Sequence, residues 1–113
     1  MLYLSEMISA IAAIEDFTSD MGRDDFLEDG KTKSAVVRQF EILGEASKAL
    51  PKDIKALAPD IPWNMVAGMR DRLIHAYFVV DYRLVWDTVE EELPRLKERL
   101  EMLQIEVKKT EGL

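Results

Sequence analysis

The sequence predicts an all-α protein, an up-and-down bundle of four main helices with short additional helical turns. Apolar residues recur at steps of three and four over several long segments, which is the period of one buried helix face. No segment alternates between apolar and polar residues cleanly enough to predict a β-strand. At 113 residues, the chain is expected to form a single helical-bundle domain over residues 1–113 with one adequate core.

The first helix is expected from Leu2 to Thr18. Its apolar stripe consists of Leu4, Ile8, Ile11 and Ile14. A short helical turn should follow, with Asp20 or Asp24 as its cap and Gly30 as its end.

The second long helix is expected from Thr32 to Leu50, with Thr32 or Ser34 as its N-cap. Gly44 lies in the middle of this segment, where glycine costs about 1 kcal/mol relative to alanine. A glycine at such a position usually marks the close approach of another backbone. We therefore expect a second segment to pack tightly against this helix at Gly44.

The second half of the chain contains two further helical segments. Pro62 should open a central helix that continues to Phe78, after a short helix that begins near Pro51. Apolar residues then recur at helical spacing from Tyr82 to Val107, with Asp81 as the expected cap. Pro94 inside this run removes a backbone hydrogen bond, so the helix should kink or split there.

The charge balance restricts the partners of the protein. The chain has 15 basic and 22 acidic residues, which gives a net charge of −7. Such a surface as a whole repels phosphate backbones, so any contact with nucleic acid requires a local basic patch. Arg38 and Lys48 on the second helix are candidate RNA contacts, with an ordinary solvated helix face as the alternative.

Several classes of protein are disfavoured by composition. The chain has no cysteine, which excludes disulfides and thiolate metal sites and fits a cytoplasmic location. No apolar run approaches the ~20 residues that a membrane span requires, so we expect no contact with membranes. The first residues, M-L-Y-L-S-E-M, carry an acid and no basic region, which is not typical of a signal peptide.

The central segment carries the residues that packing alone does not explain: Arg70, Asp71, Arg72, His75 and Tyr77. His75 is the only histidine in the chain. In an uninterrupted helix, Arg70 and Tyr77 share a face, whereas His75 lies over Asp71 and Arg72. Asp71 could then orient the imidazole and stabilise its protonated form, with Arg72 as a second supporting residue.

This geometry leaves Arg70 and His75 of one chain poorly placed to act on the same small group. The long arginine side chain could reach around the helix, or the helix could be irregular near Gly68. Alternatively, a two-fold dimer could bring two copies of the segment into one cleft, which is the arrangement that symmetry favours.

The chemistry of these groups suits metal-free cleavage of RNA. A lone histidine without thiolates or spaced acids is a poor set of metal ligands, and we expect neither a metal nor another cofactor. Histidine can take or give a proton near neutral pH. Arginine binds phosphate oxygens and offsets the charge that develops on them during cleavage. A structural role for Arg70 and His75, as in most helices, is the alternative.

The segment I-P-W-N-M-V-A-G-M-R-D-R-L-I-H-A-Y resembles the HepT-like branch of the HEPN (higher eukaryotes and prokaryotes nucleotide-binding) family. The hallmark R-x4-H-x-Y of that branch is matched by Arg70, His75 and Tyr77. Two further stretches, G-E-A at 44–46 and V-W-D at 85–87, are also similar to it. The resemblance covers nearly the whole chain.

The resemblance implies a helical ribonuclease toxin that forms a homodimer and places two R-x4-H-x-Y motifs in one cleft. It also implies an antitoxin partner of the minimal nucleotidyltransferase kind, which transfers AMP to Tyr77 and silences the toxin. Asp71 departs from the family, where asparagine is commoner at this position. The acidic balance and Asp71 favour an alternative, a non-catalytic module that binds a nucleotide or a nucleotidyltransferase. A purely structural helical oligomer is the third hypothesis.

Overall fold

The computed structural model describes residues 2–75 and 79–111, and it confirms the all-α class. The longest helices are α3 with 20 residues, α8 with 19 and α1 with 17. The elements in chain order are α1 Leu2–Thr18, α2 Arg23–Glu28, α3 Gly30–Ala49, α4 Lys52–Lys55, α5 Trp63–Ala67, α6 Met69–Leu73, β1 Ile74–His75, β2 Val79–Val80, α7 Tyr82–Glu91 and α8 Leu93–Glu111.

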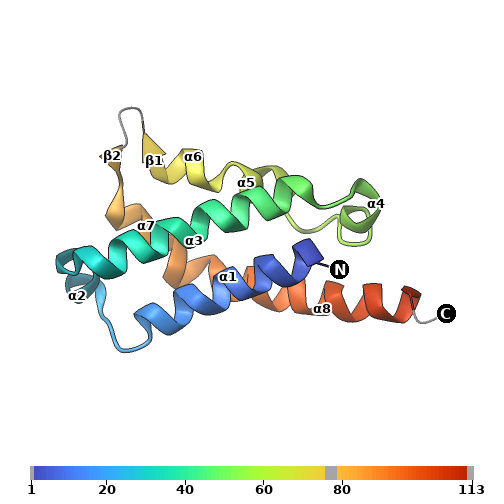
Figure 1. The fold of residues 1–113 in the computed structure, drawn as a ribbon, viewed down its shortest axis with the longest axis horizontal. Coiled ribbons are helices and arrows are strands. Elements are labelled where there is room, and N and C mark those ends of the chain that lie inside the picture. Colours follow the sequence, from blue (N-terminus) through green and yellow to red (C-terminus); the bar gives the residue numbers. More distant parts are fainter. Residues whose placement is uncertain (1, 76–78, 112–113) are drawn as a thin grey trace.

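Helix α3 lies at the centre of the molecule (Figure 1). It packs antiparallel to α1 along one side and contacts α5 and α6 along another. Helix α8 packs against α1, and α7 connects the two strands to α8. The molecule is therefore elongated, with extents of 49 × 30 × 20 Å.

One cluster of buried apolar side chains joins the helices. The stripe predicted for α1 is buried at Leu4, Ile11 and Ile14, while Ile8 is partly buried. The stripe of α8 is buried along its whole length, at Leu93, Leu96, Leu100, Leu103 and Val107. Lys97 of α8 also donates to Glu15 of α1 at 2.8 Å, and this contact raises the pKa of the lysine. Within the described ranges, no helix is both long and apolar enough to span a bilayer.

The starts of α2 and α3 differ from the prediction. The N-cap of α2 is Gly22, whose N–H donates to the Asp25 carboxylate at 3.0 Å, so neither Asp20 nor Asp24 caps this helix. Helix α3 begins at Gly30, two residues earlier than expected.

The cap of α3 explains its early start. The carboxylate of Asp29 accepts a hydrogen bond from the N–H of Thr32 at 3.0 Å. Because Asp29 fills the N-cap position, Thr32 and Ser34 lie inside the helix and Gly30 starts α3 instead of ending α2. The hydrogen bond to Thr32 also lowers the pKa of Asp29.

Two boundaries in the second half of the chain are confirmed. Asp81 caps α7, and its carboxylate accepts from the N–H of Leu84 at 3.1 Å. The run from Tyr82 is split in front of Pro94, because α7 ends at Glu91 and α8 begins at Leu93. Pro94 thus lies in the first turn of α8, where its missing N–H is tolerated.

The prediction of one central helix from Pro62 to Phe78 is wrong. The chain forms α5, breaks at Gly68, forms α6 and leaves the helical conformation after Leu73. Ile74 has extended dihedral angles, φ −117° and ψ 111°, and pairs with Val80 in an antiparallel register. β-branched residues favour this pairing, and the N–H of Asp81 donates to the carbonyl of Leu73 at 2.9 Å. The short strand pair was not predicted.

Candidate active site

The break in the central segment changes how the motif residues are arranged. Arg70 lies on α6, directly after the break at Gly68. The backbone of His75 belongs to β1 and pairs with Val79. The prediction of His75 over Asp71 and Arg72 rests on a helix that continues beyond Leu73, and that helix is not formed. The irregularity near Gly68, one of the three arrangements considered, is present. Tyr77 lies outside the described residues.

Gly44 positions the motif segment against α3. A Cβ atom at Gly44 would lie 3.4 Å from the carbonyl oxygen of Ala67, at the end of α5. This confirms the predicted close approach of a second backbone. Because α6 follows α5 after a single residue, the contact places Arg70 beside α3.

The structure brings three basic residues predicted from the sequence together around one cavity of about 450 Å³. These residues are Arg38 and Lys48 of α3 and Arg70 of α6. The rest of the wall is formed by Tyr3, Glu6, Glu41, Ile42, Gly44, Glu45, Ala46, Ala49 and Ala67. The cavity therefore lies over α3, between the first turns of α1 and the junction of α5 with α6.

The cavity is less acidic than the molecule as a whole. It is lined by three basic and three acidic side chains, whereas the chain has 15 basic and 22 acidic residues. Lys48 lies 3.7 Å from Glu45, but both side chains are more than half exposed. Pairs of this kind contribute at most about 1 kcal/mol, so the lysine can exchange this contact for a phosphate.

Arg70 makes a similarly weak contact with its chain neighbour. Its Nη1 lies 3.4 Å from Oδ1 of Asp71, and the Asp71 side chain is 73% exposed. Asp71 therefore competes with an incoming anion for the guanidinium and does not lock it in place.

Arg72 has a different environment from Arg70. Its Nη2 donates to Oε2 of Glu92 at 2.8 Å, which ties α6 to the junction between α7 and α8. The Nε atom of Arg72 is buried, with no hydrogen-bond partner in the described part of the chain. Arg72 does not line the cavity, so its contact holds the motif segment in place.

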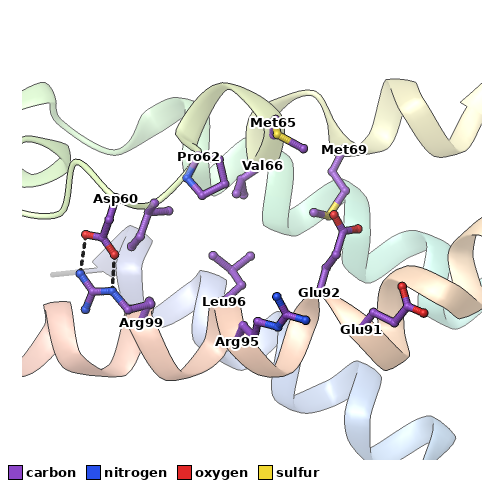
Figure 2. Close-up of a pocket in the computed structure, with 11 residues that line it drawn as sticks. Asp60, Pro62, Met65, Val66, Met69, Glu91, Glu92, Arg95, Leu96 and Arg99 are labelled. Atoms are coloured by element: carbon purple, nitrogen blue, oxygen red, sulfur yellow. Dashed lines mark hydrogen bonds and ion pairs between the residues drawn. The ribbon is translucent and has the colours of Figure 1, made fainter.

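A second cavity, of about 520 Å³, lies between α5 and α8 (Figure 2). Apolar side chains form much of its wall, among them Met65, Met69 and Leu96. At one end, the Arg99 guanidinium donates to both carboxylate oxygens of Asp60, at 2.5 and 2.7 Å. This hydrogen bonding lowers the pKa of Asp60 and raises that of Arg99. No motif residue within the described ranges lines this second cavity.

Several residues of the first cavity were missed by the sequence analysis, among them Glu41 and Tyr3. Glu41 could have been found, because it follows Arg38 by three residues and therefore shares its face of α3. Tyr3 gave no signal, because the sequence does not show which part of α3 the start of α1 contacts.

The fold and the cavity define a small α-helical protein with guanidinium and ammonium groups around one cavity, and these groups are suited to phosphate oxygens. The sequence then assigns the family. The family model "Ribonuclease HepT-like" matches residues 7–103, and the chain belongs to this HepT-like ribonuclease family.

Relatives extend over nearly the whole chain. "Probable ribonuclease HepT" of Thermococcus cleftensis is 53% identical over 102 residues, which are 90% of this chain and 93% of the relative. "Putative RNase MJ0125" of Methanocaldococcus jannaschii is 44% identical, over 89% of this chain and 87% of its own. "Putative RNase TTE0752" of Caldanaerobacter subterraneus is 39% identical, over 92% and 94%. No solved structure gives a significant match.

Proposed function

We propose that this protein is a metal-independent endoribonuclease, the toxin of a toxin–antitoxin pair, and that Arg70 and His75 carry its chemistry. The observation that supports the proposal most strongly is the cavity shared by Arg70, Arg38 and Lys48 in a chain of the HepT-like ribonuclease family. The three cations come from two helices and balance the three carboxylates of the cavity, so an RNA backbone meets less repulsion there than over a surface with the overall charge of −7.

In the proposed reaction, the 2′-oxygen of a ribose attacks the adjacent phosphorus atom. The P–O5′ bond breaks, which leaves a 2′,3′-cyclic phosphate and a free 5′-hydroxyl group. His75 takes the proton of the 2′-hydroxyl or donates a proton to the leaving 5′-oxygen. Arg70 stabilises the negative charge that builds on the phosphate oxygens in the transition state.

The proposal includes a homodimer. A two-fold axis beside the motif would place two copies of Arg70 and His75 in one cleft, so each protomer could supply one proton-transfer group. The strand pair offers an apolar contact for such an interface, because Val79, the pairing partner of His75, is 61% exposed.

We further propose that a nucleotidyltransferase antitoxin silences the protein by transferring AMP to Tyr77. The modification would add a phosphate and an adenosine two residues from His75, which would repel and obstruct an RNA backbone. Intact-mass measurement after co-expression with such a partner tests this step. An AMP adduct that persists in a Tyr77→Phe variant would place the modification elsewhere.

One observation favours the second candidate function, a non-catalytic module that binds a nucleotide or a nucleotidyltransferase. The contact between Arg70 and Asp71 at 3.4 Å reduces the availability of the guanidinium for a scissile phosphate. A protein that binds its partner tightly and leaves all tested RNA intact would support this alternative.

The main experiment compares RNA cleavage by the purified protein in the presence of EDTA with cleavage by His75→Ala and Arg70→Ala. Removing one charge-stabilising donor typically slows such chemistry by about 10²-fold or more, and we expect losses of this order. Arg83→Ala is the matched control, because Arg83 is exposed on α7 and does not line the cavity. Undiminished cleavage by His75→Ala would refute the assignment of the proton-transfer group.

A further inference from the structure

We propose that Glu41 selects the base of the RNA held in the cavity beside Arg70, with a preference for guanine, and that Tyr3 provides the surface on which a base stacks. This inference rests on the proposed ribonuclease function. It adds a preference for single-stranded RNA with an accessible guanine, which neither the family nor the names of the relatives specify.

Glu41 is the least exposed of the three carboxylates in this cavity, because Glu6 and Glu45 are exposed. It is half-buried, and it makes no hydrogen bond or ion pair with any residue that the structure describes. Glu45, by contrast, pairs with Lys48. Because an ionised carboxylate accepts hydrogen bonds and donates none, a ligand that satisfies Glu41 must present N–H or O–H groups.

The positions of the cations indicate which part of an RNA Glu41 meets. Arg38 precedes Glu41 by one helical turn, and Lys48 lies about 15 Å from Arg38 along the axis of α3. Arg70 faces the same cavity from α6. Phosphates are attracted to these cations and repelled by the carboxylate, so Glu41 can accept hydrogen bonds from a base or from a ribose hydroxyl, and of these only the base can give a sequence preference.

The four bases differ in what they offer to a carboxylate. Guanine presents two adjacent donors, N1–H and the N2 amino group, which match the two oxygens of Glu41. Adenine and cytosine present one exocyclic amino group next to an acceptor nitrogen. Uracil presents a single N–H between two carbonyl oxygens, which repel the carboxylate. The expected order is guanine first, adenine and cytosine next, and uracil last.

Tyr3 supplies affinity without selectivity. Tyr3 lines the cavity from α1 and the residue is 39% exposed, so its side chain is accessible to a ligand. Stacking on an aromatic side chain tolerates every base, because each base has a π-face. Stacking also requires an unpaired base, which favours single-stranded over double-stranded RNA.

The test measures binding of the full chain to fluorescently labelled single-stranded oligonucleotides by anisotropy. Each oligonucleotide is oligouridine with a single guanine, adenine or cytosine, and the set places this base at every position in turn. The His75→Ala variant serves as the parent, so that the RNA stays intact. We expect about a tenfold tighter Kd with the best-placed guanine than with uridine alone.

Three variants in this background separate the roles. Glu41→Gln should abolish the preference for guanine, because an amide can also pair with uracil. Tyr3→Ala should weaken binding of all oligonucleotides alike, whereas Tyr3→Phe should not. Glu98→Gln, at an exposed position on α8, is the matched control and should keep the preference. Thermal unfolding of each variant confirms that it is folded.

The outcomes distinguish this inference from the proposed function. If the protein without substitutions cleaves RNA but shows no base preference in binding, the role of Glu41 is refuted and the ribonuclease function stands. The same conclusion follows if the protein cleaves RNA and Glu41→Gln keeps the preference for guanine. If the protein neither binds nor cleaves any RNA, the proposed function fails, and the inference fails with it.

Discussion

The proposed ribonuclease function predicts that replacement of Asp71 by asparagine accelerates RNA cleavage. The carboxylate of Asp71 lies 3.4 Å from the guanidinium of Arg70, and the two side chains are 73% and 39% exposed. An exposed pair of this kind contributes about 0.2–1 kcal/mol, which a phosphate must overcome to bind the arginine. Removing this competition should raise kcat/KM by about 1.5- to 5-fold. The gain should shrink as salt increases, because the Debye length is already about 8 Å at physiological ionic strength.

The assay measures kcat/KM for cleavage of a single-stranded RNA by the parent and by Asp71→Asn, each at low and at high salt. Asp87→Asn is the matched control, since it removes the same charge from an exposed position on α7 outside the cavity. In an Arg70→Ala background the gain from Asp71→Asn should largely disappear, because the two residues act through one contact. A gain of equal size in Asp87→Asn, or no gain in a folded Asp71→Asn protein, would refute this reasoning.

Three further predictions concern the fold that supports the cavity. Gly44→Leu should lower the free energy of unfolding by about 1–3 kcal/mol in urea titrations, because its side chain would overpack against the carbonyl of Ala67, 3.4 Å from the Cβ position. Leu100→Ala should lower it by about 2–5 kcal/mol, since Leu100 is completely buried in the core; an unchanged urea midpoint would contradict that burial. Because Arg99 lowers the pKa of Asp60 below its ordinary value of 3.8, the pair stabilises the fold above that pH and loses this effect as the pH falls through the lowered pKa. The free energy of unfolding of Asp60→Asn should therefore depend less on pH than that of the parent below about pH 4. Equal pH dependence in the two proteins would show that the pair does not stabilise the fold.

The predictions that succeeded depend on neighbours in the chain. The buried face of α8 can be predicted from the sequence because an apolar residue recurs at every third or fourth position and faces the core. Asp81 and Pro94 act within one helical turn, so their effects follow from local rules. The early start of α3 was missed because Asp29, Thr32 and Ser34 are all competent caps, and the sequence does not show which one is used.

The prediction of one continuous central helix is wrong because of a contact between residues that are distant along the chain. Its apolar spacing is compatible with a helix up to Phe78, but the pairing of Ile74 with Val80 ends the helix at Leu73. The contact between Leu73 and Asp81 that accompanies this pairing joins residues eight apart, beyond the reach of a periodicity argument.

The candidate site was partly predictable. Positive charge on one helix makes Arg38 and Lys48 candidates and the spacing to His75 makes Arg70 one, while Gly44 indicates only that some second backbone packs against α3. The contribution of Tyr3 depends on how α1 lies against α3, which the sequence does not specify. The catalytic roles of Arg70 and His75 remain predictions.

Because α6 ends at Leu73, Arg70 and His75 lie on different elements, a helix and a strand. The helix of Arg70 follows α5, whose end contacts α3 at Gly44. The strand of His75 is joined to the start of α7 by the pairing of Ile74 with Val80 and by the hydrogen bond from Asp81 to Leu73. Under the proposed function, a substitution beside Gly44 should therefore affect the role of Arg70 more than that of His75, and a substitution in the strand pair should do the reverse.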